Sequence, residues 1–164
     1  EVFDALRDLN LYWYEEPVPD KDAEGYLMIK NHIDVPLAGG ENLMYREGFW
    51  PVLDQYLMDI IMPDVTIVGG ISELKKVAAM AEARNIPTAP HGPFGPVTIA
   101  SGVQAMATHP EFLILEYAWG EVPWRHDLLL PSEQIVNGRI KVPDRPGLGV
   151  ELNPEGVKKY RVNP

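Results

Sequence analysis

Residues 57–91, LMDIIMPDVTIVGGISELKKVAAMAEARNIPTAPH, contain one complete strand–helix–strand unit and decide the fold class. The apolar runs Leu57–Met62 and Ile86–Ala89 have the length and composition of strands that are buried on both faces. The segment between them, residues 72–84, has apolar residues at helical spacing, with Ser72 as its expected N-cap. A strand, a helix and a strand in this order predict two parallel strands joined by a right-handed crossover.

The same alternation continues on both sides of this unit. Further buried strands are expected at residues 11–14, 35–38 and 112–115, and further helices at residues 21–33, 46–55 and 96–108. Five strands that alternate with helices predict a parallel sheet, either doubly wound or closed as a barrel. The pattern changes after residue 128, where Asn137-Gly138 between two short apolar pairs predicts a β-hairpin.

The composition excludes several classes of protein. The 164 residues include 14 Lys+Arg and 24 Asp+Glu, a net charge of −10, so the chain lacks the basic surface that nucleic-acid binding needs. No apolar run approaches the ~20 residues of a membrane span. The chain has no cysteine, which removes disulfides, thiolate metal sites and thiol nucleophiles. We therefore expect a soluble protein, by default cytoplasmic, that binds neither nucleic acid nor membrane.

An ionisable residue follows each of the five apolar runs. These residues are Glu15, Glu41, Asp64, His91 and Glu116, separated by 26, 23, 27 and 25 residues. Because the C-terminal ends of parallel strands share one face of the fold, these side chains are expected to converge there. Carboxylates held close together repel one another, and a divalent cation would compensate. Oxygen ligands without cysteine favour Mg²⁺ over Zn²⁺, with Glu15 and Glu41 as the candidate ligands.

Simpler interpretations exist for each polar residue taken alone. An acid at a strand–helix junction is often a helix N-cap, and Gly69-Gly70 is expected to be a structural turn because no phosphate-binding motif accompanies it. The remaining histidines and the tryptophans also have ordinary explanations. We expect His32, His109 and His126 to be solvated, Trp13 and Trp50 to serve packing, and Trp119 and Trp124 to serve packing or line a pocket.

Taken together, the strand-end motifs resemble those of the enolase superfamily, mandelate racemase subgroup. The motifs are Glu15-Glu16-Pro17, Gly40-Glu41-Asn42, Pro63-Asp64 followed by Gly69-Gly70, Pro90-His91 and Leu115-Glu116. The resemblance implies that the chain forms about strands four to eight of a (β/α)7β TIM-type barrel. It also implies that residues 1–130 belong to the barrel, that residues 131–164 return toward an α+β capping domain, and that the N-terminal half of the enzyme lies outside this chain.

The resemblance further implies a role for each strand-end residue. Glu15 and Glu41 would be ligands of one Mg²⁺ per active site. Asp64 and His91 would form the family's Asp–His dyad, in which the histidine acts as a base. Glu116 would hydrogen-bond the substrate carboxylate while negative charge builds on it.

The activity implied by the resemblance is dehydration of an acid sugar by a hydro-lyase of the enolase superfamily. Such an enzyme removes the α-proton and expels the β-hydroxyl, and residues 90–96 resemble this branch. The general acid would be His91 or a residue outside the chain, and Glu16 would support the site beside a ligand. An α-hydroxy-acid racemase, a cycloisomerase, and a non-catalytic fragment or binding module are the alternatives. No lysine ends a strand, which ranks the cycloisomerase below the racemase. A homo-oligomer is expected.

Overall fold

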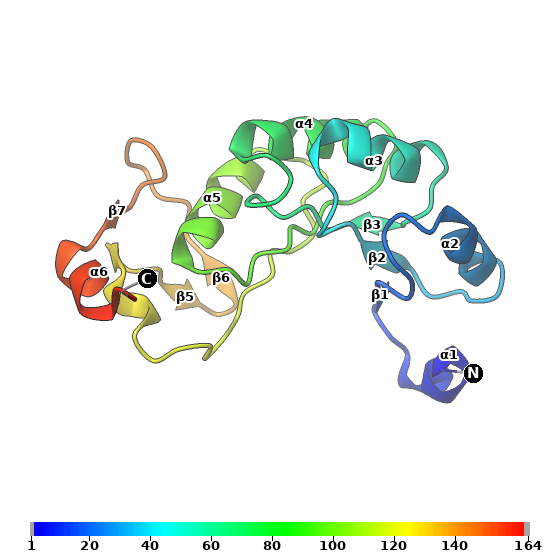
Figure 1. Cartoon of the computed structure of the whole chain (residues 1–164), viewed down its shortest axis with the longest axis horizontal. Coiled ribbons are helices and arrows are strands. Elements are labelled where there is room, and N and C mark those ends of the chain that lie inside the picture. Colours follow the sequence, from blue (N-terminus) through cyan, green and yellow to red (C-terminus); the bar gives the residue numbers. More distant parts are fainter. Residues whose placement is uncertain (1, 163–164) are drawn as a thin grey trace.

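The computed structural model describes residues 2–162 and places five strand segments side by side in chain order. The first three are β1 (Tyr14–Glu15), β2 (Leu37–Gly39) and β3 (Ile60–Ile61), which form a parallel sheet in the order β1-β2-β3. Thr88 continues the array through isolated parallel bridges to Ile61 and Phe112. The predicted parallel arrangement of five segments is therefore confirmed (Figure 1).

The hydrogen-bonded strands are shorter than the apolar runs from which they were predicted. Proline has no N–H to donate to a ladder. Pro36 immediately precedes β2, Pro63 lies two residues after β3, and Pro87 lies inside the run that was expected to be the fourth strand. Thr88 still donates its N–H to the carbonyl of Glu111 at 2.9 Å. The prolines thus shorten the ladder without changing the order of the strands.

A helix follows each of the first three strands and the Thr88 bridge. These helices are α2 (Ala23–Lys30), α3 (Tyr45–Asp54), α4 (Ile71–Glu82) and α5 (Pro96–Met106), close to the predicted ranges, while α1 (Val2–Leu6) and a 3₁₀ turn (Arg7–Leu9) precede β1. Figure 1 shows α3, α4 and α5 as neighbours along one side of the strands. The predicted N-cap of α4 is wrong: Gly70, with φ of 92°, occupies that position, and Ser72 lies inside the helix.

The strands bury apolar side chains on both faces, as a parallel sheet requires. On one face, Leu37 and Ile61 join a large cluster with Phe49 of α3 and Leu74 of α4. On the other face, a smaller cluster contains Ala38, Ile60, Met62 and Ala89, with Trp13 and Leu113 packed against it. Neighbouring residues of one strand point to opposite faces, so the two clusters use alternate positions. Ionisable side chains are consequently left to the strand ends.

The C-terminal part has a different organisation from the parallel array. A 3₁₀ turn (Arg125–Asp127) leads to β4 (Leu129–Leu130), which pairs antiparallel with β7 (Glu151–Leu152), and α6 (Pro154–Tyr160) follows. Between them, β5 (Ile135–Val136) and β6 (Arg139–Ile140) form the predicted hairpin around Asn137-Gly138. The division at residue 130 and the direction of the C-terminal segment toward a capping domain stay predictions. In the described part of the chain, no helix has the length and apolarity to cross a membrane.

A buried ion cluster joins the segment after the last strand to the C-terminal part. The guanidinium of Arg125 donates to Glu133 and lies 4.7 Å from the ring centre of Tyr117. The hydroxyl of Tyr117 donates to the same Glu133 oxygen at 2.7 Å. The side chains of Arg125 and Glu133 are only 4% and 7% exposed. Removing one charge from such a pair leaves the other buried without compensation.

We expect Glu133→Gln to lower the free energy of unfolding by about 3 kcal/mol, because it leaves the buried Arg125 charge without its main partner. Glu121 also binds Arg125, at 3.0 Å, but its side chain is 46% exposed. Glu121→Gln is therefore the control and should cost less than about 1 kcal/mol. Urea unfolding of the full-length protein measures both changes. Equal losses for the two variants would contradict a special role for the buried pair.

Candidate active site

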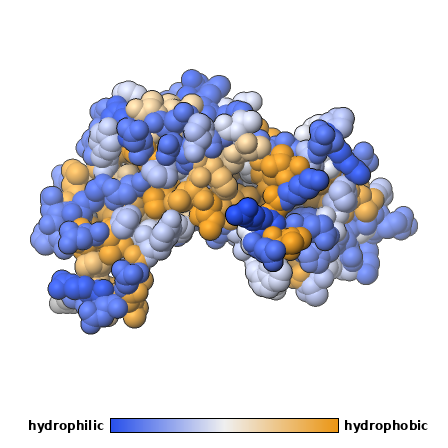
Figure 2. Space-filling model, turned by 180° about the vertical axis from the view of Figure 1, so that it is seen from behind, coloured by the Kyte–Doolittle hydropathy of each residue, from blue (hydrophilic) through white to orange (hydrophobic). Residues whose placement is uncertain are grey.

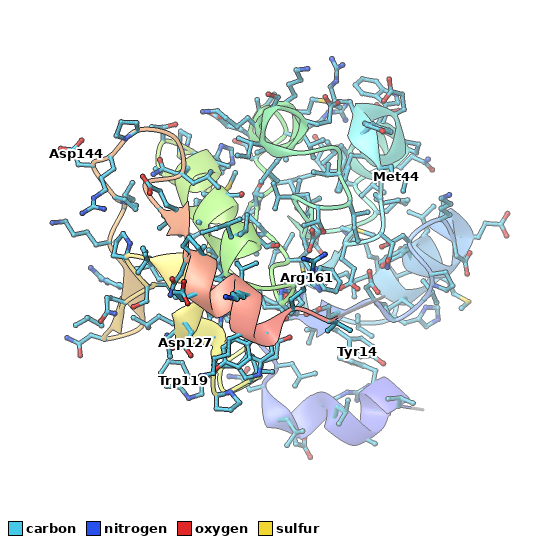
Figure 3. The ribbon with its side chains drawn as sticks, turned by 60° about the vertical axis from the view of Figure 1, so that its left-hand side comes forward. Tyr14, Met44, Trp119, Asp127, Asp144 and Arg161 are labelled. Carbon is cyan, nitrogen blue, oxygen red and sulfur yellow. The ribbon has the colours of Figure 1, made fainter. Side chains whose placement is uncertain are left out.

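Four of the five predicted site residues meet at one edge of the parallel array. Glu41 follows β2, Asp64 follows β3, His91 follows Thr88, and Glu116 follows the segment that begins at Phe112. Each lies just beyond the C-terminal end of its strand segment, so the shared direction of the strands brings them together. Tyr14 and Met44, labelled in Figure 3, bound the part of the chain that carries Glu15 and Glu41.

His91 and Asp64 form a buried hydrogen-bonded pair. The Nδ1 atom of His91 lies 2.7 Å from Oδ2 of Asp64, which is fully buried. The other oxygen of Asp64 accepts hydrogen bonds from the backbone N–H and the hydroxyl of Thr66. When Nδ1–H of a neutral His91 donates its hydrogen bond to Asp64, Nε2 carries no proton and its lone pair is free. The geometry thus pairs an imidazole with a buried carboxylate that orients it.

The free nitrogen of His91 faces two carboxylates. Its Nε2 atom lies 3.3 Å from Oε2 of Glu41 and 3.6 Å from Oε2 of Glu116. The same Glu116 oxygen accepts the backbone N–H of Gly92 at 3.2 Å. The ring of Phe94 contacts the imidazole edge-on, with 5.4 Å between centroids. The reactive side of His91 is therefore enclosed by two acids and one aromatic ring.

The crowding of acids is visible in the pKa of Glu41, which is raised above its usual value. Burial is the largest cause, because a partly dehydrated carboxylate is less stable than its neutral form. The carboxylates of Glu15, Glu116 and Asp20 raise this pKa further. His91 acts in the opposite direction. A cation bound among these oxygens would relieve the repulsion.

Glu15 lies at this edge as well but does not contact His91 in the structure. Its Oε2 accepts the indole N–H of Trp13 at 2.9 Å, and its charge reaches Glu41. Within residues 2–162, no three His, Cys, Asp or Glu side chains gather closely enough to form a metal site. Two carboxylates that repel each other are suitable donors for a hard ion such as Mg²⁺. The residues present therefore fit part of a magnesium site, and further oxygens have to come from elsewhere.

Two further acids, Glu16 and Asp20, lie near the turn that carries Glu41. Glu16, with φ of 40°, packs beside Gly39, and its pKa is raised to about 7, first by burial and then by the charges of Asp20 and Glu41. Asp20 is 8% exposed and accepts the backbone N–H groups of Gly40 and Asn42. The sequence analysis expected support from Glu16 but missed Asp20. Its position in a Pro-rich turn was the only available signal, and such a turn does not reveal which distant amides it binds.

One predicted histidine environment is wrong. His109 is not solvated: its side chain is 8% exposed, and Nδ1 lies 3.8 Å from Oε2 of Glu82 on α4. The cause is the packing of α5 against α4, which covers the loop after α5. His32 and His126 are exposed, as predicted.

Trp119 also follows its prediction, since it borders a groove of about 780 Å³ beside α5 together with Phe112 and Ile135. Trp124 instead stacks on Tyr160 at 4.6 Å. Figure 2 shows where apolar residues reach the surface in the hollow between the two ends of the molecule.

A family model described as enolase C-terminal domain-like matches residues 1–156 of the chain. The chain belongs to this family. The resemblance to the enolase superfamily and its mandelate racemase subgroup is thereby confirmed, and this chain has the α/β fold of an enolase C-terminal domain. The chain is 33% identical over 157 residues to D-xylonate dehydratase of Haloferax volcanii, covering 96% of the chain and 38% of that protein. It is 32% identical to D-galactarolactone cycloisomerase of Agrobacterium fabrum, covering 97% of the chain and 44% of that protein.

Solved structures of enolase-superfamily proteins are also similar in fold to this chain. A mandelate racemase/muconate lactonizing enzyme-like protein from Rubrobacter xylanophilus matches with a TM-score of 0.90 and 31% identity, over 96% of this chain and 41% of that one. A protein described as an L-alanine-DL-glutamate epimerase from Burkholderia xenovorans, bound to magnesium and fumarate, matches with a TM-score of 0.88 and 28% identity, over 97% of this chain and 39% of that one. This enolase C-terminal domain chain spans less than half the length of these relatives.

The raised pKa of Glu16 predicts a pH-dependent stability. The folded protein holds this proton more tightly than the unfolded chain, whose carboxyl has a pKa near 4.5. The resulting stabilisation is complete below pH 4.5 and is lost as the pH rises to about 7. In EDTA, the free energy of unfolding should therefore fall across this range more steeply for the wild type than for Glu16→Gln. Urea unfolding at several pH values measures this difference, and parallel profiles would contradict it.

Proposed function

We propose that the complete protein is a Mg²⁺-dependent hydro-lyase that dehydrates an acid sugar. The observation that carries this proposal is the His91–Asp64 pair, whose free nitrogen faces Glu41 and Glu116 at 3.3 and 3.6 Å. Relatives named as dehydratases of D-xylonate and D-gluconate, 33% and 34% identical to this chain, support the choice of substrate class. A complete enzyme would contain this chain as about strands four to eight of a (β/α)7β barrel, with residues 131–164 directed toward a capping domain.

His91 would remove the proton α to the substrate carboxylate through Nε2. Asp64 would stabilise the imidazolium that forms, because its carboxylate already binds Nδ1 at 2.7 Å. Thr66 holds the other oxygen of Asp64 and so fixes the plane of the pair. Asp64 is fully buried, which strengthens its attraction for a charged ring. The pair is therefore prepared to accept one proton without rearrangement.

Glu116 would hydrogen-bond the substrate carboxylate while negative charge accumulates on it. This role requires a protonated Glu116, since only the neutral acid has a proton to donate. Its Oε2 lies 3.6 Å from Nε2 of His91, so the two side chains would meet the same end of the substrate, Glu116 at the carboxylate and His91 at the α-carbon. The proton taken by His91 would leave with the β-hydroxyl as water, or a residue outside this chain would supply that proton.

Glu15 and Glu41 would hold the Mg²⁺ ion together with oxygens from outside the chain. When bound, the ion stabilises negative charge that develops on the substrate carboxylate. Burial raises the pKa of Glu41 most, and the neighbouring acids raise it further, which supports a site where a divalent cation would offset the repulsion among them.

Two alternatives use the same residues in part. A racemase needs the same base and metal but a second base on the opposite face of the substrate. A cycloisomerase is favoured by the 32% identical relative of that name from Agrobacterium fabrum. None of the parallel strand segments ends in a lysine, which keeps the cycloisomerase below the dehydratase. A non-catalytic module would not need the charged cluster around His91.

We expect His91→Asn to abolish exchange of the substrate α-proton, because the amide cannot accept it as a base. The full-length protein with Mg²⁺ in D₂O is observed by ¹H NMR against a panel of sugar acids and α-hydroxy acids. Loss of the α-proton with a new methylene signal indicates dehydration, and exchange alone indicates racemisation. Undiminished exchange in His91→Asn rejects the assigned base, and no exchange in the wild type with any acid rejects the proposed chemistry.

We expect Glu41→Gln to weaken Mg²⁺ binding by at least about tenfold, since a charged oxygen ligand becomes a neutral one. Isothermal titration of the full-length protein with MgCl₂ measures the affinity. Glu47→Gln, on the first turn of α3, is the matched control and should bind Mg²⁺ as the wild type does. An unchanged affinity in Glu41→Gln would remove this residue from the metal site.

A further inference from the structure

The turn that carries Glu41 is held by side-chain hydrogen bonds on both sides of that residue. Gly40 has φ of 104°, so the chain bends sharply immediately before Glu41. A Cβ atom at Gly40 would lie 3.0 Å from the ring of Phe49, so the turn is pressed against α3. The N–H groups on either side of Glu41, those of Gly40 and Asn42, donate to a side chain and not to a neighbouring strand. Both are bound by a single side chain.

That side chain is Asp20. Its Oδ1 accepts the N–H of Gly40 at 2.9 Å, and its Oδ2 accepts the N–H of Asn42 at 3.3 Å. Asp20 is only 8% exposed, and bonds from N–H groups to a buried carboxylate are stronger than those to a neutral acceptor. One carboxylate therefore bridges the residue before and the residue after Glu41.

Asp20 is itself held in a tight turn. The N–H of Asp22 donates to the carbonyl of Pro19 at 2.8 Å, and Asp22 then caps α2 by accepting the N–H of Gly25. This turn begins a few residues after Glu15, at the end of β1. Asp20 thus connects the loop that follows one proposed metal ligand with the loop that carries the other.

A carboxylate at position 20 repels the neighbouring acids Glu16 and Glu41, so its presence there needs a reason. Asp20 lies close enough to Glu16 and Glu41 for its charge to disfavour theirs. A neutral asparagine would avoid that repulsion. However, the amide of asparagine has one accepting oxygen and a donating nitrogen, so it would present a donor to one of the two N–H groups. Only a carboxylate can accept both bonds on separate oxygens.

We propose that Asp20 is a positioning residue that sets the direction of the Glu41 carboxylate for metal binding. This inference rests on the proposed function, because it assigns Asp20 a role through Glu41 and the Mg²⁺ site. Asp20 does not contact substrate or metal in this role. Residues that orient metal ligands typically change metal affinity by about 10- to 100-fold when they are replaced.

The test compares Asp20→Asn with Asp22→Asn in the full-length protein. Both variants replace a carboxylate that accepts backbone N–H groups in the same loop, but Asp22 binds only α2. Titration with Mn²⁺, followed by electron paramagnetic resonance, measures metal affinity without turnover. Asp20→Asn should weaken binding about tenfold or more, and Asp22→Asn should change it less than about twofold. Thermal unfolding in EDTA reports the integrity of each variant.

A second measurement separates positioning from general damage. If Asp20 acts through the metal ligand, raising the Mg²⁺ concentration should restore most of the kcat of Asp20→Asn, with a higher half-saturating Mg²⁺ concentration. A loss of kcat that persists at saturating Mg²⁺, or a Mn²⁺ affinity equal to that of the wild type, overturns the inference. If Asp20→Asn does not fold, Asp20→Ser, whose hydroxyl can accept only one of the two bonds strongly, takes its place with the same expected loss of affinity.

The outcomes also separate this inference from the proposed function. A wild-type protein that binds no Mn²⁺ overturns both, because neither the metal site nor its positioning residue then exists. A wild-type protein that binds Mn²⁺ tightly while Asp20→Asn binds it equally well overturns only the role of Asp20. In that case the dehydratase proposal is unaffected.

Discussion

Two neighbouring strands of the parallel sheet, β2 and β3, bury both of their faces, and this burial decides where charged groups can lie. Leu37 and Ala38 are consecutive residues of β2, and both are fully buried, one in each hydrophobic cluster. Ile60 and Ile61 of β3 are also buried, one in each cluster. Apart from Thr88, the buried side chains along the strands are apolar, and the ionisable groups occur where the ladder ends. The site is therefore a consequence of how the core is built.

The candidate site holds more negative than positive charge, because several carboxylates lie around one histidine. Several carboxylates surround a single imidazole, and the raised pKa values of Glu16 and Glu41 show that their ionised forms are disfavoured. Backbone N–H groups offset part of this cost, since Gly92 donates to Glu116 and Gly40 donates to Asp20. Proteins accept unfavourable local electrostatics mainly where a ligand will compensate. The acidity of the whole chain, with a net charge of −10, does not arise from this cluster alone.

Local patterns predicted the order of elements and the strand-end residues, because both depend on residues that are close in sequence. The hairpin at Asn137-Gly138 and the helix at residues 71–82 are examples. The features that were missed depend on distant contacts. Asp20 binds amides 20 and 22 residues away, and His109 is covered by a neighbouring helix. The error at Ser72 had a local cause, since a glycine with positive φ replaced the expected side-chain cap.

Each of the five strand segments has one ionisable residue at its C-terminal end, and the ladder that aligns these residues is made of backbone and, apart from Thr88, of apolar side chains. A substitution at a strand end, or a change of loop length after it, can therefore alter the chemistry without disturbing the core. During evolution strand–helix units can vary independently of one another. The near-constant spacing of the five strand-end residues reflects this modular construction, in which specificity can change one loop at a time. These residues are Glu15, Glu41, Asp64, His91 and Glu116.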